Sequence, residues 1–147
     1  MGAEVVAFSH SPSKKKEAEE LGASIFVDTS DKAQVDSVRG TLNFLLVTAN
    51  GGDMANEYVT WMDLEGQIIY LAIPPNKMSY RAFEFIMNEV AITGSAIGGM
   101  NVIKRMLDFA AEHNIRPIIE RFPMSKINDA IERVESGRIR YRAVLEN

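Results

Sequence analysis

The sequence predicts an α/β protein built on a doubly wound parallel sheet. Short apolar runs rich in β-branched residues alternate with helical stretches along the 147 residues. The connections between them are short and contain glycine, proline or small polar residues. Strand and helix alternate five times in this way, which is typical of βαβ units with parallel strands.

Local signals bound the elements of the first hundred residues. Pro12 suits the first position of a helix capped by Ser11, and Gly22 suits its left-handed C-terminal position. Asp31 can cap a second helix, and the pair Pro74–Pro75 ends a strand because proline cannot donate to a ladder. We expect strands at residues 5–8, 25–27, 44–47, 67–73 and 90–93, and helices at 13–21, 31–38, 53–62 and 81–87.

The last third of the chain continues this alternation after a glycine-rich bend at residues 94–99. A strongly amphipathic helix is expected at residues 101–113. It is followed by an expected strand at 118–122, a helix at 125–137 and a strand at 142–145. The length of 147 residues suits a single domain.

Composition excludes several classes of function. The net charge of −4 does not favour a nucleic-acid partner. No apolar run reaches membrane-spanning length, and the N-terminus lacks a signal-peptide pattern. The sequence has no cysteine, so it holds neither disulfides nor thiolate metal ligands. We therefore expect a cytoplasmic protein that binds neither nucleic acid nor membrane.

The segment after the first expected strand points to a dinucleotide. In doubly wound folds this place reads the ribose 2′ position, where an acid selects NAD and basic or small polar residues admit NADP. Ser9, His10 and Ser11 stand there, and no acid appears before Glu17. No G-x-G-x-x-G motif occurs in the sequence. Either the fold is a different one, or the first strand and its phosphate-binding loop lie outside this sequence.

The lysine run at residues 14–16 has two interpretations. Cations in the first turn and acids toward the end of a helix oppose the helix dipole, and a bound phosphate would supply the counter-charge. Lys15 and Lys16 each have an acid four residues later, whereas Lys14 has none. Lys14 is therefore the candidate phosphate ligand, with Ser9 and Ser11 as hydrogen-bond donors. A solvated lysine run is the alternative.

At this point the sequence resembles a known family. The segments that carry the resemblance are 1–6 (MGAEVV), 11–15 (SPSKK), 20–23 (ELGA), 94–95 (GS), 98–99 (GG), 106–109 (MLDF), 111–113 (AEH) and 140–142 (RYR). Together they resemble the coenzyme-binding, C-terminal part of zinc-type medium-chain alcohol dehydrogenases, in the NADP-dependent cinnamyl-alcohol-dehydrogenase-like branch. The resemblance covers essentially the whole chain.

The resemblance implies a Rossmann-like fold without its first strand and glycine-rich loop, and a set of NADP-binding residues. Residues 1–100 would form the truncated dinucleotide-binding domain, and residues 101–147 a segment that returns to the catalytic domain in the family. The residues implied to bind the cofactor are Ser9, His10, Lys14, Thr48, Ala49, Ala72, Ile73, Ser95, Ala96, Ile97 and Arg142, and the residue pattern described above adds Ser11. Each also has a structural interpretation: Thr48–Ala49 as a turn, Ala72–Ile73 as a strand end, Ser95 as a bend residue, and Arg142 as the partner of a surface acid.

The sequence departs from the family in its metal ligands. The family's catalytic zinc needs cysteine and histidine ligands, and its structural zinc needs a cysteine cluster, whereas this sequence offers only His10 and His113. We therefore expect no metal site and no catalytic residue in this chain. The expected function is the NADP(H)-binding portion of an alcohol dehydrogenase or aldehyde reductase, an oxidoreductase that passes hydride between NADP and an alcohol or aldehyde, catalytically incomplete alone.

Other functions remain open at this stage. The chain could be a non-catalytic NADP(H)-binding module, or part of a zinc-free quinone-reductase relative. A methyltransferase would place an acid directly after Phe8, and a receiver domain would cluster acids at the strand ends, and neither pattern is present.

The sequence also makes an assembly expectation. In the strand order 3-2-1-4-5-6, a missing first strand would leave the strands at 5–8 and 44–47 without their central neighbour. We expect these two strands to pair directly, to exchange strands with a second copy, or to aggregate. The strand at 90–93 offers a second dimer surface. The chain is thus expected to be a homo-oligomer or to depend on an N-terminal half.

Overall fold

The computed structural model describes residues 2–49 and 54–147. The chain divides into two compact units, Met1–Ala96 and Ile97–Asn147, here called unit 1 and unit 2. Each unit is described by itself. The predicted division at residue 100 remains a prediction.

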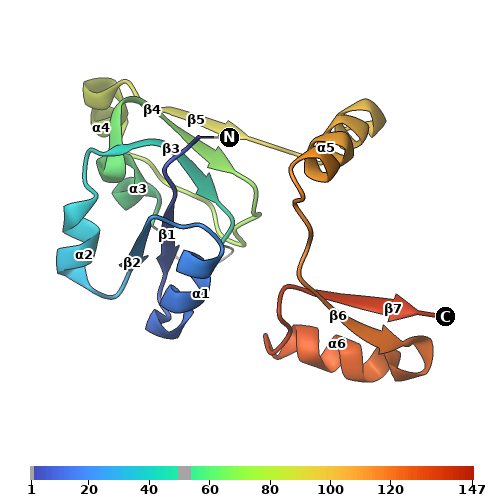
Figure 1. Cartoon of the computed structure of the whole chain (residues 1–147). Coiled ribbons are helices and arrows are strands. Elements are labelled where there is room, and N and C mark those ends of the chain that lie inside the picture. Colours follow the sequence, from blue (N-terminus) through green and yellow to red (C-terminus); the bar gives the residue numbers. More distant parts are fainter. Residues whose placement is uncertain (1, 50–53) are drawn as a thin grey trace. The chain divides into compact units, whose positions relative to one another are not determined.

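Unit 1 begins with two βα steps whose boundaries follow local signals (Figure 1). Strand β1 (Val6–Ser9) is followed by a 3-10 turn, η1 (Pro12–Lys14), and by helix α1 (Lys15–Glu20). Ser11 occupies the N-cap position of the turn, although its side chain makes no capping hydrogen bond. Gly22 ends this segment with a φ of +102°, a conformation that favours glycine. Helix α1 is thus shorter than predicted because the 3-10 turn takes its first residues.

The second step runs from strand β2 (Ile25–Asp28) through helix α2 (Lys32–Ser37) to strand β3 (Leu42–Val47). Asp31 caps α2 as predicted, because its carboxylate accepts hydrogen bonds from the backbone N–H groups of Ala33 and Gln34. The structure confirms both strands, and each extends slightly beyond its predicted range.

The rest of unit 1 consists of helix α3 (Ala55–Trp61), strand β4 (Met62–Tyr70), helix α4 (Ala82–Asn88) and strand β5 (Ala91–Gly94). The predicted opening of α3 at Asp53 lies outside the described residues. The range predicted for β4 was wrong at both ends. The strand already begins at Met62, across a register shift opposite β3, and its pairing ends at Tyr70 rather than at Ile73.

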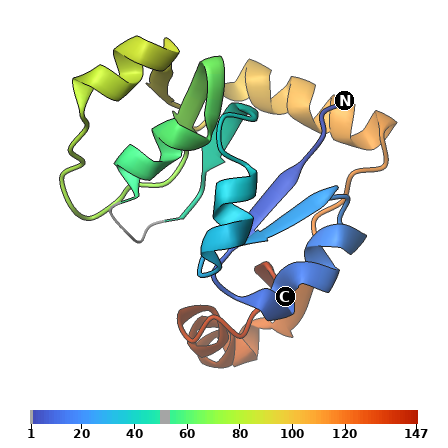
Figure 2. The same ribbon diagram turned by 90° about the vertical axis from the view of Figure 1, so that its left-hand side faces the viewer.

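The strands of unit 1 form two parallel sheets, β1–β2 and β3–β4–β5. Helices α1 and α2 pack on β2, while α3 and α4 pack on β4. This is the predicted doubly wound, Rossmann-like architecture without the first strand. Figures 1 and 2 both place β1 between β2 and β3. Direct pairing of β1 with β3, one of the three outcomes expected from the sequence, is not found among the described residues, because these strands belong to separate sheets.

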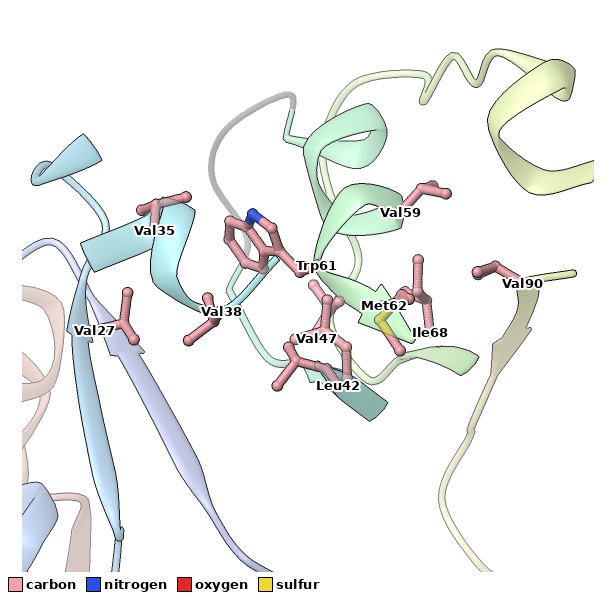
Figure 3. Close-up of a cluster of buried hydrophobic side chains, with 11 residues drawn as sticks. Val27, Val35, Val38, Leu42, Val47, Val59, Trp61, Met62, Ile68 and Val90 are labelled. Atoms are coloured by element: carbon pink, nitrogen blue, oxygen red, sulfur yellow. The ribbon is translucent and has the colours of Figure 1, made fainter. Parts of the chain in front are cut away.

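One hydrophobic core nevertheless spans both sheets of unit 1. Trp61, at the end of α3, is 1% exposed. Its ring stacks on Phe8 of β1, with the ring centroids 4.8 Å apart and the planes within 2°. Figure 3 shows the Trp61 ring between Val38, which follows α2, and the side chains of β3 and β4. Burial of this ring therefore holds the two sheets together without strand pairing between them.

Unit 2 contains a long helix and a small βαβ unit. Helix α5 (Met100–Glu112) comes first. Strand β6 (Ile119–Pro123) leads through the 3-10 turn η2 (Met124–Lys126) and helix α6 (Ile127–Glu135) to strand β7 (Arg142–Glu146). Strands β6 and β7 pair in parallel, so the predicted elements of this region are confirmed.

Candidate functional site

The candidate site lies at the carboxyl ends of the strands of unit 1. Val47, Tyr70 and Gly94 are register partners at the ends of β3, β4 and β5. The residues that follow them leave the sheet at one edge, where ligands bind in doubly wound folds. The predicted residues Thr48, Ala49, Ala72, Ile73, Ser95 and Ala96 all belong to these segments.

The loop after β1 carries small polar groups. The Ser9 hydroxyl oxygen accepts a hydrogen bond from the backbone N–H of Ser11 at 3.1 Å. The backbone N–H of Lys14 donates to the Ser11 carbonyl at 3.0 Å. These bonds fold residues 9–14 into a tight turn, in which His10 is exposed and Ser9 and Ser11 are partly buried.

The neighbouring strand contributes an acid that the sequence interpretation overlooked. Asp28, the last residue of β2, is the register partner of Ser9. Its carboxylate already accepts hydrogen bonds from the backbone N–H and the hydroxyl of Ser30. Asp28 therefore stabilises the turn after β2, and the end of β1 itself keeps its small polar character. Aligning the two predicted strands in parallel would have placed Asp28 beside Ser9, and this alignment was the signal that could have identified it.

The structure separates Lys14 from the two lysines that follow it. The Lys15–Glu19 and Lys16–Glu20 pairs form at 4.0 and 3.8 Å between nitrogen and oxygen. Lys14 is exposed, and no salt bridge to it is found within residues 2–49 and 54–147. Glu17, however, lies in the first turn of α1, so the charges oppose the helix dipole less than the sequence suggested.

Backbone hydrogen bonds fix the chain after β3 and β4. The N–H groups of Leu71 and Ala72 both donate to the Val47 carbonyl, at 3.0 and 3.1 Å. The N–H of Ser95 donates to the Tyr70 carbonyl at 3.0 Å. The backbone N–H groups of Ala72 and Ser95 are thus already hydrogen-bonded within the sheet. Any contact of these two residues with a ligand would use their carbonyl groups or side chains.

A side chain on α3 fixes the far end of the loop that follows β4. The Asn56 amide nitrogen donates to the Ser79 carbonyl at 3.0 Å, and the Asn56 amide oxygen accepts from the backbone N–H of Arg81 at 3.0 Å. The loop that carries Ala72 and Ile73 is therefore anchored at both ends. Sequence interpretation missed Asn56, because no local pattern relates a helix residue to a loop that follows the next strand.

The remaining predicted residues belong to unit 2. Ile97 is its first residue and is almost fully exposed. Arg142 begins β7, and its backbone N–H donates to the Arg140 carbonyl at 3.1 Å. Tyr141 between the two arginines has a φ of +70°, which is uncommon for a bulky residue. Within unit 1, the predicted residues lie at the carboxyl ends of strands of two separate sheets, and Ile97 and Arg142 belong to unit 2.

The part of the chain that the structure describes holds no cluster of three histidine, cysteine, aspartate or glutamate side chains that could bind a metal. With no cysteine and two histidines in the sequence, the donors of this chain do not fit a zinc site. None of the described helices combines the length and apolarity that crossing a bilayer requires.

Comparison with known proteins identifies the family. The sequence profile described as "Zinc-binding dehydrogenase" matches residues 1–112. The chain belongs to the zinc-binding dehydrogenase family. The family assignment covers most of the chain and agrees with the predicted resemblance.

Relatives within this family share the sequence and the fold. Over 146 residues the chain is 36% identical to a probable formaldehyde dehydrogenase of Bacillus subtilis, and equally identical to the NADP-dependent alcohol dehydrogenase C 1 of Mycolicibacterium smegmatis. Each match covers 99% of this chain and 42% of the relative. A cinnamyl alcohol dehydrogenase from Sorghum bicolor matches with a TM-score of 0.90 and 31% identity, over 98% of this chain and 41% of that chain. The chain thus spans less than half the length of these dehydrogenases.

Proposed function

We propose that this chain is the NADP(H)-binding portion of an alcohol dehydrogenase or aldehyde reductase. The cofactor would lie across the carboxyl edge of unit 1. Residues Ser9, His10, Ser11 and Lys14 would bind the 2′-phosphate. Thr48 and Ala49 would line its path, and Ala72, Ile73, Ser95, Ala96 and Ile97 would contact the nicotinamide end. Arg142 would approach the pyrophosphate.

The end of β1 is the observation that carries this proposal. A carboxylate here would bind the ribose 2′-hydroxyl of NAD and repel the 2′-phosphate of NADP. Ser9 and Ser11 stand in its place, and the nearby Asp28 is engaged with Ser30. Lys14 adds a cation without a salt bridge to the described part of the chain. The group of residues therefore suits NADP(H), in agreement with the cofactor named for the Mycolicibacterium relative.

The reaction of the whole family needs more than this chain supplies. In the family a bound zinc ion would act as a Lewis acid on the alcohol or aldehyde oxygen. The residues of this chain do not fit zinc, so its own contribution is to bind and orient NADP(H) for hydride transfer. We further propose that residues 101–147 return to a catalytic domain, as in the family.

Cofactor titration tests the proposal directly. The purified chain is titrated with NADPH and with NADH, and the Lys14→Ala variant is titrated in parallel. A charge-assisted contact to phosphate contributes about 1.5–3 kcal/mol, so we expect roughly tenfold or greater preference for NADPH. Lys14→Ala should weaken NADPH binding and leave NADH binding unchanged, while the matched Lys16→Ala change should affect neither. Equal affinities, or no binding of NADPH, would contradict the proposal.

Metal analysis tests the proposed incompleteness. After dialysis, the chain should retain no stoichiometric zinc and should not oxidise NADPH in the presence of an aldehyde. One tightly held zinc ion per chain, measured by elemental analysis, would show that other side chains of this sequence serve as ligands.

A further inference from the structure

An acidic side chain lies one strand away from the residues proposed to bind the 2′-phosphate. Asp28 ends β2 and is the register partner of Ser9, which ends β1. Neighbouring strands lie about 4.8 Å apart, and because the pleats of paired strands are aligned, register partners present their side chains on the same face of the sheet. The backbone N–H of Thr29 also donates to the Ser9 carbonyl at 3.0 Å. The Asp28 carboxylate therefore lies beside the proposed phosphate-binding turn.

Ser30 holds this carboxylate within the turn that leads from β2 into α2. The backbone N–H of Ser30 donates to Oδ1 of Asp28 at 2.9 Å, and the Ser30 hydroxyl donates to the same oxygen. The backbone N–H of Asp31 closes the turn by donating to the Asp28 carbonyl at 3.0 Å. The backbone N–H of Asp28 in turn donates to Oε1 of Gln34 on α2, also at 3.0 Å. The main chain at Asp28 is thus fixed, and Ser30 sets the direction of its side chain.

We propose that Ser30 is a positioning residue for cofactor selectivity, which keeps the Asp28 carboxylate from competing with the 2′-phosphate of NADP(H); this inference rests on the proposed binding of that phosphate at the end of β1. The Ser9 hydroxyl accepts a hydrogen bond from the Ser11 N–H, and a hydroxyl that accepts one bond can still donate its own proton. Across one strand spacing, a carboxylate released from Ser30 would reach that proton before a phosphate does.

Electrostatics favours the same competition. Lys14 is an exposed cation of this loop, and no salt bridge to it is found in the described part of the chain. A released Asp28 carboxylate would attract Lys14 and repel the phosphate, since both anions bind the same donors. NADH carries a 2′-hydroxyl in place of the phosphate, and a carboxylate accepts a hydrogen bond from that hydroxyl. Loss of the Ser30 hydroxyl should therefore shift selectivity from NADPH toward NADH.

The experiment measures the dissociation constants of NADPH and NADH for the full chain and its variants. Ser30→Ala removes the hydroxyl donor and leaves the backbone N–H, so the release of Asp28 is partial. We expect NADPH to bind roughly threefold to tenfold more weakly to this variant, by about 0.7–1.4 kcal/mol, and NADH to bind equally well or more tightly. Ser30→Thr keeps the hydroxyl and should retain the constants of the native chain.

Two further variants separate positioning from a merely structural role of the turn. Combining Ser30→Ala with Asp28→Asn removes the charge of the competing group and should restore NADPH affinity to the native value or above it. Ser37→Ala is the matched control, because it also removes a serine hydroxyl that forms a hydrogen bond, here to the Gln34 carbonyl on α2. It should leave both dissociation constants unchanged.

The failure of this inference is distinguishable from the failure of the proposed function. A native chain that binds NADPH no more tightly than NADH would refute the proposed function and this inference with it. A native preference for NADPH that Ser30→Ala leaves unchanged would overturn the positioning role alone. Equal weakening of both cofactors by Ser30→Ala, without recovery when Asp28→Asn is added, would also overturn it, because only the fold of the turn would then matter.

Discussion

The two units of the chain differ in how they bury apolar surface. Unit 1 has a core of buried aliphatic side chains around Trp61. Among the described residues of unit 2, only Ala130 is buried, with an exposed fraction of 3%. Helices α5 and α6 have well-formed turns, yet their large apolar residues, such as Met106, Leu107 and Ile131, remain exposed.

This difference separates secondary structure from tertiary stability. The amphipathic pattern of α5 and α6 predicts helices whose apolar faces pack on something. Unit 1 buries a core within its own residues, although Phe83, Ile86 and Met87 of α4 stay exposed. Unit 2 leaves most of its large apolar side chains in contact with solvent. Unit 1 should therefore determine the cooperative stability of the chain, and unit 2 should contribute little to it.

The largest expected effect comes from removing the ring that joins the two sheets. Trp61→Ala should lower the free energy of unfolding by about 3–5 kcal/mol, because a fully buried aromatic side chain leaves a cavity. That loss is comparable to the total stability of a small domain. Leu107→Ala, at a residue that is 57% exposed, should change it by less than about 0.5 kcal/mol. Denaturant unfolding followed by circular dichroism measures both, and similar losses would refute the contrast between the units.

A smaller effect is expected at the anchor of the loop that follows β4. Asn56→Ala removes both hydrogen bonds to residues 79–81 and should lower the free energy of unfolding by about 1–2 kcal/mol. Amide exchange at Arg81 should accelerate. Asn56→Asp keeps the acceptor for the Arg81 N–H and should therefore retain slow exchange there. Unchanged exchange in Asn56→Ala would mean that the loop is held by other contacts.

The smallest expected effect is a pH dependence within unit 1. Hydrogen bonds from the Gln34 side chain, and from the backbone N–H groups of Gln34 and Ala33, hold the pKa of Asp31 below its ordinary value of 3.8. A lowered folded-state pKa adds stability above the unfolded-state value, and this stability is lost as the pH falls through the folded-state value. The thermal midpoint should therefore fall in acid. Asp31→Asn keeps the cap and should fall less, and an identical acid profile would exclude this carboxylate as a cause.

Local pattern was enough to predict the elements and the sheet edge that carries the candidate site. The signals that predicted the elements act within a few residues: they are the apolar runs, Pro12, Gly22 and Asp31. In the structure, Pro12 begins the 3-10 turn, Gly22 ends the segment with a positive φ, and Asp31 caps α2. The polar residues after Phe8 lie at the end of β1 for the same reason, although the strand extends one residue further than predicted and includes Ser9. The binding roles of these residues remain predictions.

The features that sequence did not reveal depend on partners distant in the chain. The end of β4 is set by β3 and β5, which stop pairing at Val47 and Gly94, although the apolar run continues to Ile73. The register of Asp28 beside Ser9 and the separation of β1 from β3 follow from pairing between strands. Trp61 joins the two sheets through its contact with Phe8, and these two residues lie far apart in the sequence.

The central claim, that the carboxyl edge of unit 1 binds NADP(H), is tested most directly by hydrogen exchange of the chain with and without NADPH. We expect slower exchange in the segments after β1, β3 and β4, at residues 9–14, 48–49 and 71–73. NADH at the same concentration should protect residues 9–14 much less. Protection elsewhere only, or equal protection of residues 9–14 by both cofactors, would contradict the account.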